Sequence, residues 1–348
     1  MINKQSKIFV TITFAVYIFM PLATFNVVQL DFYSNIDTII FDFIFILVIV
    51  FISQYSASKL VFHRIIIAIA IGNGMYIIPQ IILNLPDLLS ISNYTWIVDG
   101  ERTSRATYGM RHANFTGTTL LIQLLSLFFL LANIKGRFRQ AVLLIIELVL
   151  FMALLTTGNR AAVYGIGIST IFVSCLFILK LFSVNIRKLI IFYFLILVVA
   201  FMTFVFDWNN FYNSSASLIE RYTIMKSVFK EINEYGDYFF GIAPIDQISL
   251  AGKYLFLRND NSFVQTIVLY GFIGLILMLI LIIYLLFKEI NIYFQENSKQ
   301  SMFKLIVFAT AISYSTMEIT LFAHGYPLSL FFWIVILYNF RSETGVKH

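Results

Sequence analysis

The sequence predicts an all-α, polytopic membrane protein, a single membrane domain over residues 1–348 that crosses the bilayer about ten times. Hydrophobic residues make up 60% of the chain and charged residues only 12%, which leaves too little polar surface to cover a water-soluble globule. Apolar stretches of roughly 18 to 23 residues recur along the chain, each long enough to cross about 30 Å of hydrocarbon as a helix. The expected spans are residues 8–28, 36–53, 63–84, 113–133, 140–156, 161–180, 188–206, 263–287, 302–321 and 325–340.

Positive charge predicts the orientation of these spans. If the spans alternate in direction, most of the 24 Lys and Arg residues fall on the side of the N-terminus, whereas the short loop from Asp31 to Asp37 has none. Because Lys and Arg accumulate in cytoplasmic loops, we expect both termini in the cytoplasm. This topology also accounts for the net charge of +6, so a nucleic-acid partner is not expected.

Two loops on the opposite, outer side are long, namely residues 85–112 and the large outer loop of residues 207–262. Loops of this length usually have a function. In the large loop, Ser217 and Glu220 form a capping box that begins a predicted amphipathic surface helix, which ends before Gly236. Apolar residues recur along it at helical spacing, namely Leu218, Tyr222, Met225, Phe229 and Ile232.

Two outer arginines are candidate anion ligands. Arg221 falls inside the apolar arc of the predicted surface helix, and Arg160 follows a tight turn between two spans. Arginine suits phosphate because its planar fork donates two parallel hydrogen bonds and keeps its proton. The alternatives are a snorkelling or salt-bridged side chain for Arg221 and an interfacial anchor for Arg160. Together the two arginines indicate a diphosphate clamp.

The end of the first long loop adds further basic residues directly before a span. Arg105, Arg111, His112 and Asn114 are candidates for binding an anionic substrate there. The alternative is a solvated basic collar against lipid headgroups. In the last short outer loop, His324 is either an acid or base, or an interfacial side chain.

A polar triplet opens the eighth expected span. Asp260, Asn261 and Ser262 are ordinary N-cap residues, and a carboxylate at Asp260 is also placed to act as a general base toward a sugar hydroxyl. Gly271 and Gly274 lie one turn apart further along, which favours close helix packing.

Three carboxylates, Asp42, Glu147 and Glu318, fall inside expected spans, where ionisable groups are costly and often functional. No intramembrane Lys or Arg pairs with them in the sequence pattern, so a transporter has little support. The sequence contains no nucleotide-binding loop, no metalloprotease motif and no Asp-x-Asp pair, and its one cysteine, Cys175, lies in an apolar stretch. Neither a metal ion nor another cofactor is expected.

Four segments resemble a known family in their order and spacing over roughly residues 100–290. They are Arg105, Gly109, His112, Asn114 and Gly117 at the start of a span; Thr157-Gly158-Asn159-Arg160-Ala161; Arg221 followed by a helix and Phe240-Gly241-Ile242; and Asp260, Asn261, Gly271 and Gly274. In this order they resemble the O-antigen polymerase and O-antigen ligase superfamily of bacterial surface polysaccharide enzymes. Ala113 stands where that family usually has proline, Asn159 where it has serine, and Asp260 where the ligases have histidine.

The resemblance implies a membrane glycosyltransferase of the GT-C kind, in the inner or plasma membrane, acting on undecaprenyl-diphosphate-linked glycans outside the cytoplasm. It implies that Arg160 and Arg221 hold the diphosphate and that Asp260 activates the acceptor. The expected substrate-binding residues are Arg105, Arg111, His112, Asn114, Asn261 and His324. Membrane lipids, a flippase and a chain-length regulator are the expected partners. Because ligases use the histidine that Asp260 replaces, the resemblance favours a polymerase of capsule or lipopolysaccharide repeat units. A ligase that transfers finished polymer to a lipid or wall acceptor, and a transporter or flippase of lipid-linked sugars, are the alternatives.

Overall fold

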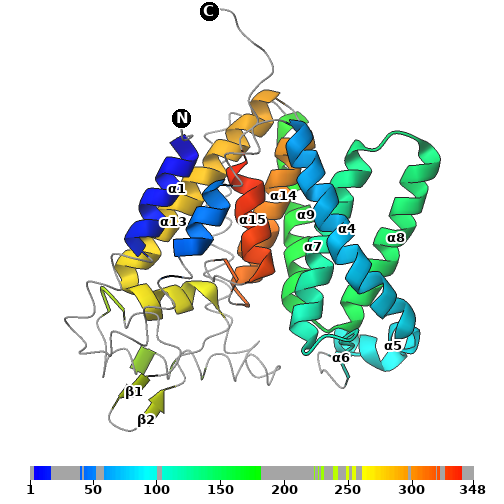
Figure 1. Ribbon diagram of the computed structural model, residues 1–348, viewed down its shortest axis with the longest axis horizontal. Coiled ribbons are helices and arrows are strands. Elements are labelled where there is room, and N and C mark those ends of the chain that lie inside the picture. Colours follow the sequence, from blue (N-terminus) through cyan, green and yellow to red (C-terminus); the bar gives the residue numbers. More distant parts are fainter. Residues whose placement is uncertain are drawn as a thin grey trace, which may run out of the picture.

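The computed structural model describes residues 4–16, 40, 43–51, 59–99, 104–181, 223, 226, 229–230, 238–241, 248–250, 253–255, 261–296, 299–318, 320–321 and 326–338. Its elements are α1 (Lys4–Phe14), α4 (Lys59–Leu83), α5 (Leu85–Leu89), η2 (Ile91–Tyr94), α6 (Trp96–Asp99), α7 (Ala113–Asn133), α8 (Arg137–Thr156), α9 (Arg160–Leu181), β1 (Ile248–Leu250), β2 (Lys253–Leu255), α13 (Ser262–Glu296), α14 (Lys299–Ser315) and α15 (Pro327–Leu337). Figure 1 shows the long helices standing side by side as a bundle.

The protein is a helical membrane protein. Five helices in the described part of the chain are long and apolar enough to cross a bilayer, namely Leu60–Leu83, Ala113–Asn133, Arg137–Thr156, Arg160–Ile178 and Ser262–Gln295. They confirm five of the predicted spans, and α7 has the predicted bounds. The other predicted spans are shorter or incompletely described. α14 has 17 residues and α15 has 11, α1 covers only part of residues 8–28, residues 43–51 are helical, and residues 188–206 lie outside the described ranges.

The two long loops contain local structure of their own. Residues 85–99 form two short helices, α5 and α6, with a 3₁₀ turn between them. In the large outer loop, β1 and β2 pair as an antiparallel hairpin with Ser249 opposite Tyr254, a feature that the sequence did not predict. The predicted helix of residues 217–235 lies almost wholly outside the described residues, although Thr223, Lys226, Phe229 and Lys230 are helical.

α14 is the central helix of the bundle and packs against α7, α9, α13 and α15 (Figure 1). Its buried apolar side chains include Phe303, Val307 and Phe308. α9 approaches α14 closely at Gly165, where a Cβ atom would lie 3.3 Å from the carbonyl oxygen of Thr310. Small residues permit such close packing between helices in a membrane, where apolar burial alone does not drive association.

One end of the bundle, the lysine end, is where α4 and α14 begin and α7, α13 and α15 finish. Phe62, Phe129, Phe303 and Tyr338 pack there, with the Phe62 and Tyr338 rings 4.4 Å apart. Beside them lies a buried ion pair in which the Lys304 Nζ atom is 3.1 Å from Glu289 Oε1, with both side chains nearly inaccessible to solvent.

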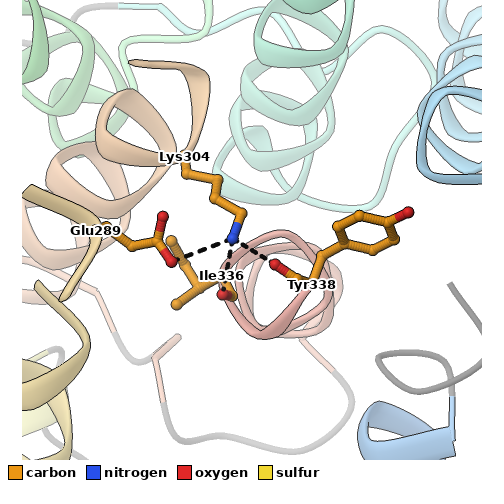
Figure 2. A network of polar contacts seen from close by, with 4 residues as sticks. All are labelled: Glu289, Lys304, Ile336 and Tyr338. Carbon is orange, nitrogen blue, oxygen red and sulfur yellow. Dashed lines mark hydrogen bonds and ion pairs between the residues drawn. The ribbon is translucent and has the colours of Figure 1, made fainter. Parts of the chain in front are cut away.

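Lys304 also holds the end of the last described helix in place. Figure 2 shows its ammonium group pointing between Glu289 and the end of α15. There Lys304 donates to the carbonyl oxygens of Ile336, at 3.4 Å, and of Tyr338. Carbonyl groups in the last turn of a helix carry partial negative charge, so a cation suits them electrostatically. The ion pair therefore joins α13, α14 and α15.

Lys304→Met should lower the free energy of unfolding by about 3–5 kcal/mol, because it leaves the Glu289 carboxylate buried without its counter-charge. Thermal unfolding in detergent measures the loss. The double variant Lys304→Met/Glu289→Leu should be more stable than the single variant, because it removes the uncompensated charge as well. A double variant less stable than Lys304→Met would contradict this account of the pair.

Candidate functional site

The other end of the bundle, the arginine end, is where α8 finishes and α7, α9 and α13 begin. Polar side chains from separate segments meet there. We call Arg105, Asn114, Asn159, Arg160, Asn261 and Glu318 the arginine-end cluster. They come from the loop before α7, the starts of α7, α9 and α13, and the turn after α14.

Arg105 forms the first link of a hydrogen-bonded chain across the cluster. Its Nε atom donates to the carbonyl oxygen of Thr157 at 2.8 Å, and its Nη2 atom donates to Asn114 Oδ1 at 2.5 Å. Asn114 Nδ2 in turn donates to Glu318 Oε1 at 3.0 Å. Asn114 therefore connects a guanidinium group to a carboxylate, with its amide oxygen facing the cation and its amide nitrogen facing the anion.

Asn159 is buried behind this chain and fixes its backbone. Its Nδ2 atom donates to the carbonyl oxygen of Asn114 at 3.2 Å and to the hydroxyl of Tyr314 at 3.3 Å. Its Oδ1 atom accepts from the amide of Ala162 at 3.1 Å, as an N-cap of α9. Asn159 thus has a structural role at the start of α9.

Two glycines make room for this arrangement. A Cβ atom at Gly117 would lie 2.3 Å from Asn159 Nδ2 and 2.5 Å from Asn159 Cβ, so α7 can approach the turn before α9 only without a side chain at this position. Gly158 has a φ of +58°, in the left-handed region, and lies beside the Arg105 side chain. These contacts bring two of the family-like segments together.

Arg160 lies beside the same turn with its guanidinium carbon 5.9 Å from the centre of the Trp96 ring. Trp96 is itself held by its indole nitrogen, which donates to the carbonyl oxygen of Leu155 at 2.8 Å. Cation–π contact orients a guanidinium group without using its hydrogen-bond donors. Arg160 is half-buried, so its charge lies at the border between the bundle and solvent.

Asn261 and Ser262 tie the start of α13 to the turn that carries Glu318. Asn261 Oδ1 accepts from the amides of Phe263, at 2.9 Å, and Val264, at 3.2 Å, which confirms the N-cap interpretation for this residue. Its Nδ2 atom donates to the carbonyl oxygen of Thr316 at 2.8 Å, and the Ser262 hydroxyl donates to the carbonyl oxygen of Glu318 at 2.8 Å.

Burial and neighbouring charges shift the pKa values of side chains in and beside the cluster. Burial lowers the pKa of the Arg105 guanidinium, and the neighbouring positive charge of Arg160 lowers it further, while Glu318 and Tyr314 oppose the change. Nearby, burial raises the pKa of Tyr108 to about 12, and its hydroxyl lies 2.7 Å from Thr156 Oγ1. Two guanidinium groups held within electrostatic reach of each other favour an anion between or beside them.

A second junction joins the remaining family-like segments. At Gly271, φ is +65° and ψ is −173°, so α13 is kinked there. After the kink, the amides of Phe272 and Ile273 donate to the carbonyl oxygens of Tyr238, at 2.8 Å, and Phe239, at 3.2 Å. Gly241 has a φ of +78°, and a Cβ atom there would lie 2.6 Å from the Gly271 nitrogen. The glycine turn therefore caps the second half of α13.

The other predicted residues are exposed, lie away from the cluster or fall outside the described residues. Arg111 and His112 are exposed, and His112 caps α7 by accepting from the amide of Asn114 at 3.1 Å. Asp260, Arg221, His324 and Asp42 lie outside the described residues. Glu147 is away from the cluster, in a largely apolar cavity of about 460 Å³ between α7, α8, α9 and α14.

Sequence reasoning missed the roles of Glu318 and Trp96. In the sequence pattern Glu318 is an intramembrane carboxylate without a partner, yet Asn114 connects it to Arg105. The sequence shows a carboxylate at the end of an apolar stretch. This pattern does not indicate which residue the carboxylate contacts. Among the described residues, no three His, Cys, Asp or Glu side chains lie close enough to hold a metal ion.

The cluster has the elements needed to bind an anion and to accept a proton. Arg105 and Arg160 supply fixed positive charge, and Glu318 supplies a carboxylate that accepts from the Asn114 amide. Searches against protein-family models, curated proteins and solved structures find no match to this chain. Its function is therefore inferred from the geometry and the sequence pattern.

Gly271→Ala should destabilise the protein by more than about 2 kcal/mol, because the new Cβ atom would lie 2.1 Å from the carbonyl oxygen of Phe239 and alanine disfavours a positive φ. Thermal unfolding in detergent tests this. Gly167→Ala in α9 is the matched control, since a Cβ atom there would meet no other atom within 4 Å, and it should keep or raise the stability. Equal losses of stability in the two variants would contradict a kink that requires glycine at position 271.

Proposed function

We propose that this chain is a membrane glycosyltransferase, a polysaccharide polymerase that joins undecaprenyl-diphosphate-linked repeat units and releases undecaprenyl diphosphate. The observation that carries the proposal is the pair of arginines, Arg105 and Arg160, which lie at the same turn before α9 at one end of a membrane bundle. Arg105 binds the carbonyl oxygen of Thr157, and the Arg160 amide binds that of Gly158. A diphosphate ester at a membrane surface is an anion that such a pair fits well.

In the proposed reaction, a hydroxyl of one lipid-linked repeat unit attacks the reducing-end carbon of the glycan on another. The lipid diphosphate leaves with the electron pair of the broken carbon–oxygen bond. Arg105 and Arg160 stabilise the charge that develops on this leaving group, which is the task that a divalent metal ion has in other transferases. Arg221, as the sequence resemblance implies, would complete the diphosphate site.

Arg105 retains capacity to bind this substrate. A guanidinium group has five N–H donors, and the contacts to Thr157 and Asn114 use the Nε and Nη2 atoms. The side chain is half-buried, so its remaining donors can reach a ligand at the mouth of the bundle. The contacts that it already makes hold the group in one orientation, and preorganised charge stabilises a developing anion without reorganisation.

Charge distribution supports an outer position for this site. The lysine end has Lys59, Arg64, Lys135, Arg137, Arg139, Lys288, Lys299 and Lys304 at or near the helix ends. By the positive-inside rule that end faces the cytoplasm, together with both termini, and the arginine end faces outward. Undecaprenyl-linked repeat units on the outer leaflet would then reach Arg105 and Arg160 from the membrane plane, after delivery by a flippase.

One assay distinguishes the proposed polymerase from two other functions. A ligase would move finished polymer to a lipid or wall acceptor and leave chain length unchanged, and a flippase would move lipid-linked sugar without joining it. Purified protein in liposomes with a lipid-linked repeat unit should instead give a ladder of longer glycans and free lipid diphosphate. Absence of both products, with intact protein, would exclude the proposed reaction.

Arg105→Ala and Arg160→Ala should each reduce release of lipid diphosphate by about 100-fold or more, because each removes a charge from the leaving-group site. Arg139→Ala is the matched control, since Arg139 is exposed and lies at the lysine end, away from the site, and it should retain most activity. Initial rates at equal protein abundance measure the effect. Similar losses in all three variants would indicate a general charge effect and contradict a specific site.

A further inference from the structure

Glu318 lies at a point where three segments are fixed to one another. Its amide donates to the carbonyl oxygen of Tyr314 at 3.0 Å, which continues the last turn of α14. Its carbonyl oxygen accepts from the Ser262 hydroxyl at 2.8 Å, and the same hydroxyl accepts from the amide of Thr320 at 2.8 Å. The backbone of Glu318 is therefore held on both sides, and its side chain projects from a fixed position.

The side chain of Glu318 faces the arginine-end cluster. Oε1 accepts from Asn114 Nδ2 at 3.0 Å, and Asn114 in turn accepts from Arg105. A carboxylate has two oxygens and about four acceptor positions, so it can accept from several donors at once. Glu318 is half-buried, and a substrate at the mouth of the bundle can reach it.

In many active sites a catalytic base is oriented by a hydrogen bond to a second group, and Glu318 and Asn114 are arranged in this way. Asn114 sets the direction of the carboxylate, and Arg105 sets the direction of Asn114. The positive charge of Arg105 lies within electrostatic reach of Glu318 and stabilises its ionised form, which is the form that accepts a proton. Arg105 would also bind the diphosphate of the donor glycan, so the donor glycan and the acceptor hydroxyl would lie next to each other.

We infer that Glu318 is a catalytic base that removes the proton from the attacking hydroxyl of the acceptor glycan, an inference that rests on the proposed function. Its carboxylate takes the hydroxyl proton as the acceptor oxygen forms a bond to the anomeric carbon. The bond from that carbon to the diphosphate oxygen breaks, and its electron pair remains on the diphosphate beside Arg105 and Arg160. No oxidant or further reactant is needed.

A substitution that keeps the size of the side chain tests this role. Glu318→Gln retains an oxygen that can accept from Asn114 but cannot take a proton, so polymer formation should fall by about 10²–10⁴-fold. Azide is an anionic nucleophile that needs no base. The variant should therefore still transfer glycan to azide and release lipid diphosphate at a rate near that of the unmodified protein.

Three control variants make the result specific. Arg160→Ala should lose transfer to both sugar and azide, because it affects the leaving group. Glu318→Asp keeps a carboxylate and should recover part of the polymer formation if Glu318→Gln is poorly folded, as judged by thermal unfolding. Asp260→Asn tests the base implied by the family resemblance, and it should lower polymer formation less than Glu318→Gln does.

The outcomes are distinct. Loss of both reactions in well-folded Glu318→Gln would show that the residue positions the site, and this would overturn the inference. Selective loss of the sugar reaction in Asp260→Asn, with Glu318→Gln active, would assign the base to Asp260 and overturn it as well. If the unmodified protein releases no lipid diphosphate with either nucleophile, the proposed function itself fails, and the inference fails with it.

Discussion

The hydrogen-bonded chain from Arg105 through Asn114 to Glu318 is the interaction on which the arginine end depends. It joins the loop before α7, the first turn of α7 and the turn after α14. Isolated charges at the border of a membrane bundle are costly, and an amide between two opposite charges satisfies both without placing them in direct contact. The chain therefore holds a cation in a fixed place while leaving part of it accessible.

The surrounding structure supports this chain from behind. Asn159 fills the space left by Gly117 and binds the backbone of Asn114, and Tyr314 connects Asn159 with Thr118. These contacts come from α7, α9 and α14, which are also the helices that pack closely at the centre of the bundle. Because the supporting groups lie on rigid helices, the position of Arg105 is set by the packing of the membrane domain as a whole.

The two ends of the bundle use charge in different ways. At the lysine end, Lys304 and Glu289 are buried together and join the last three described helices, so their charges serve stability. At the arginine end, Arg105, Arg160 and Glu318 are half-buried and lie where helices begin and end. Backbone irregularity at membrane depth is tolerated where it is buried in protein or lines a cavity, and the kink at Gly271 follows this rule.

The sequence alone determined the helical membrane class and the approximate places of the five long apolar helices, with exact bounds for α7, because length and hydropathy are local properties. It also identified Arg105, Asn114, Asn159, Arg160 and Asn261 as members of short motifs. Only the tertiary structure decided that Glu318 belongs with them, since this contact joins residues 204 positions apart and depends on how α14 packs between α7 and α9. The hairpin of β1 and β2 was missed because its short strands carry little periodic signal.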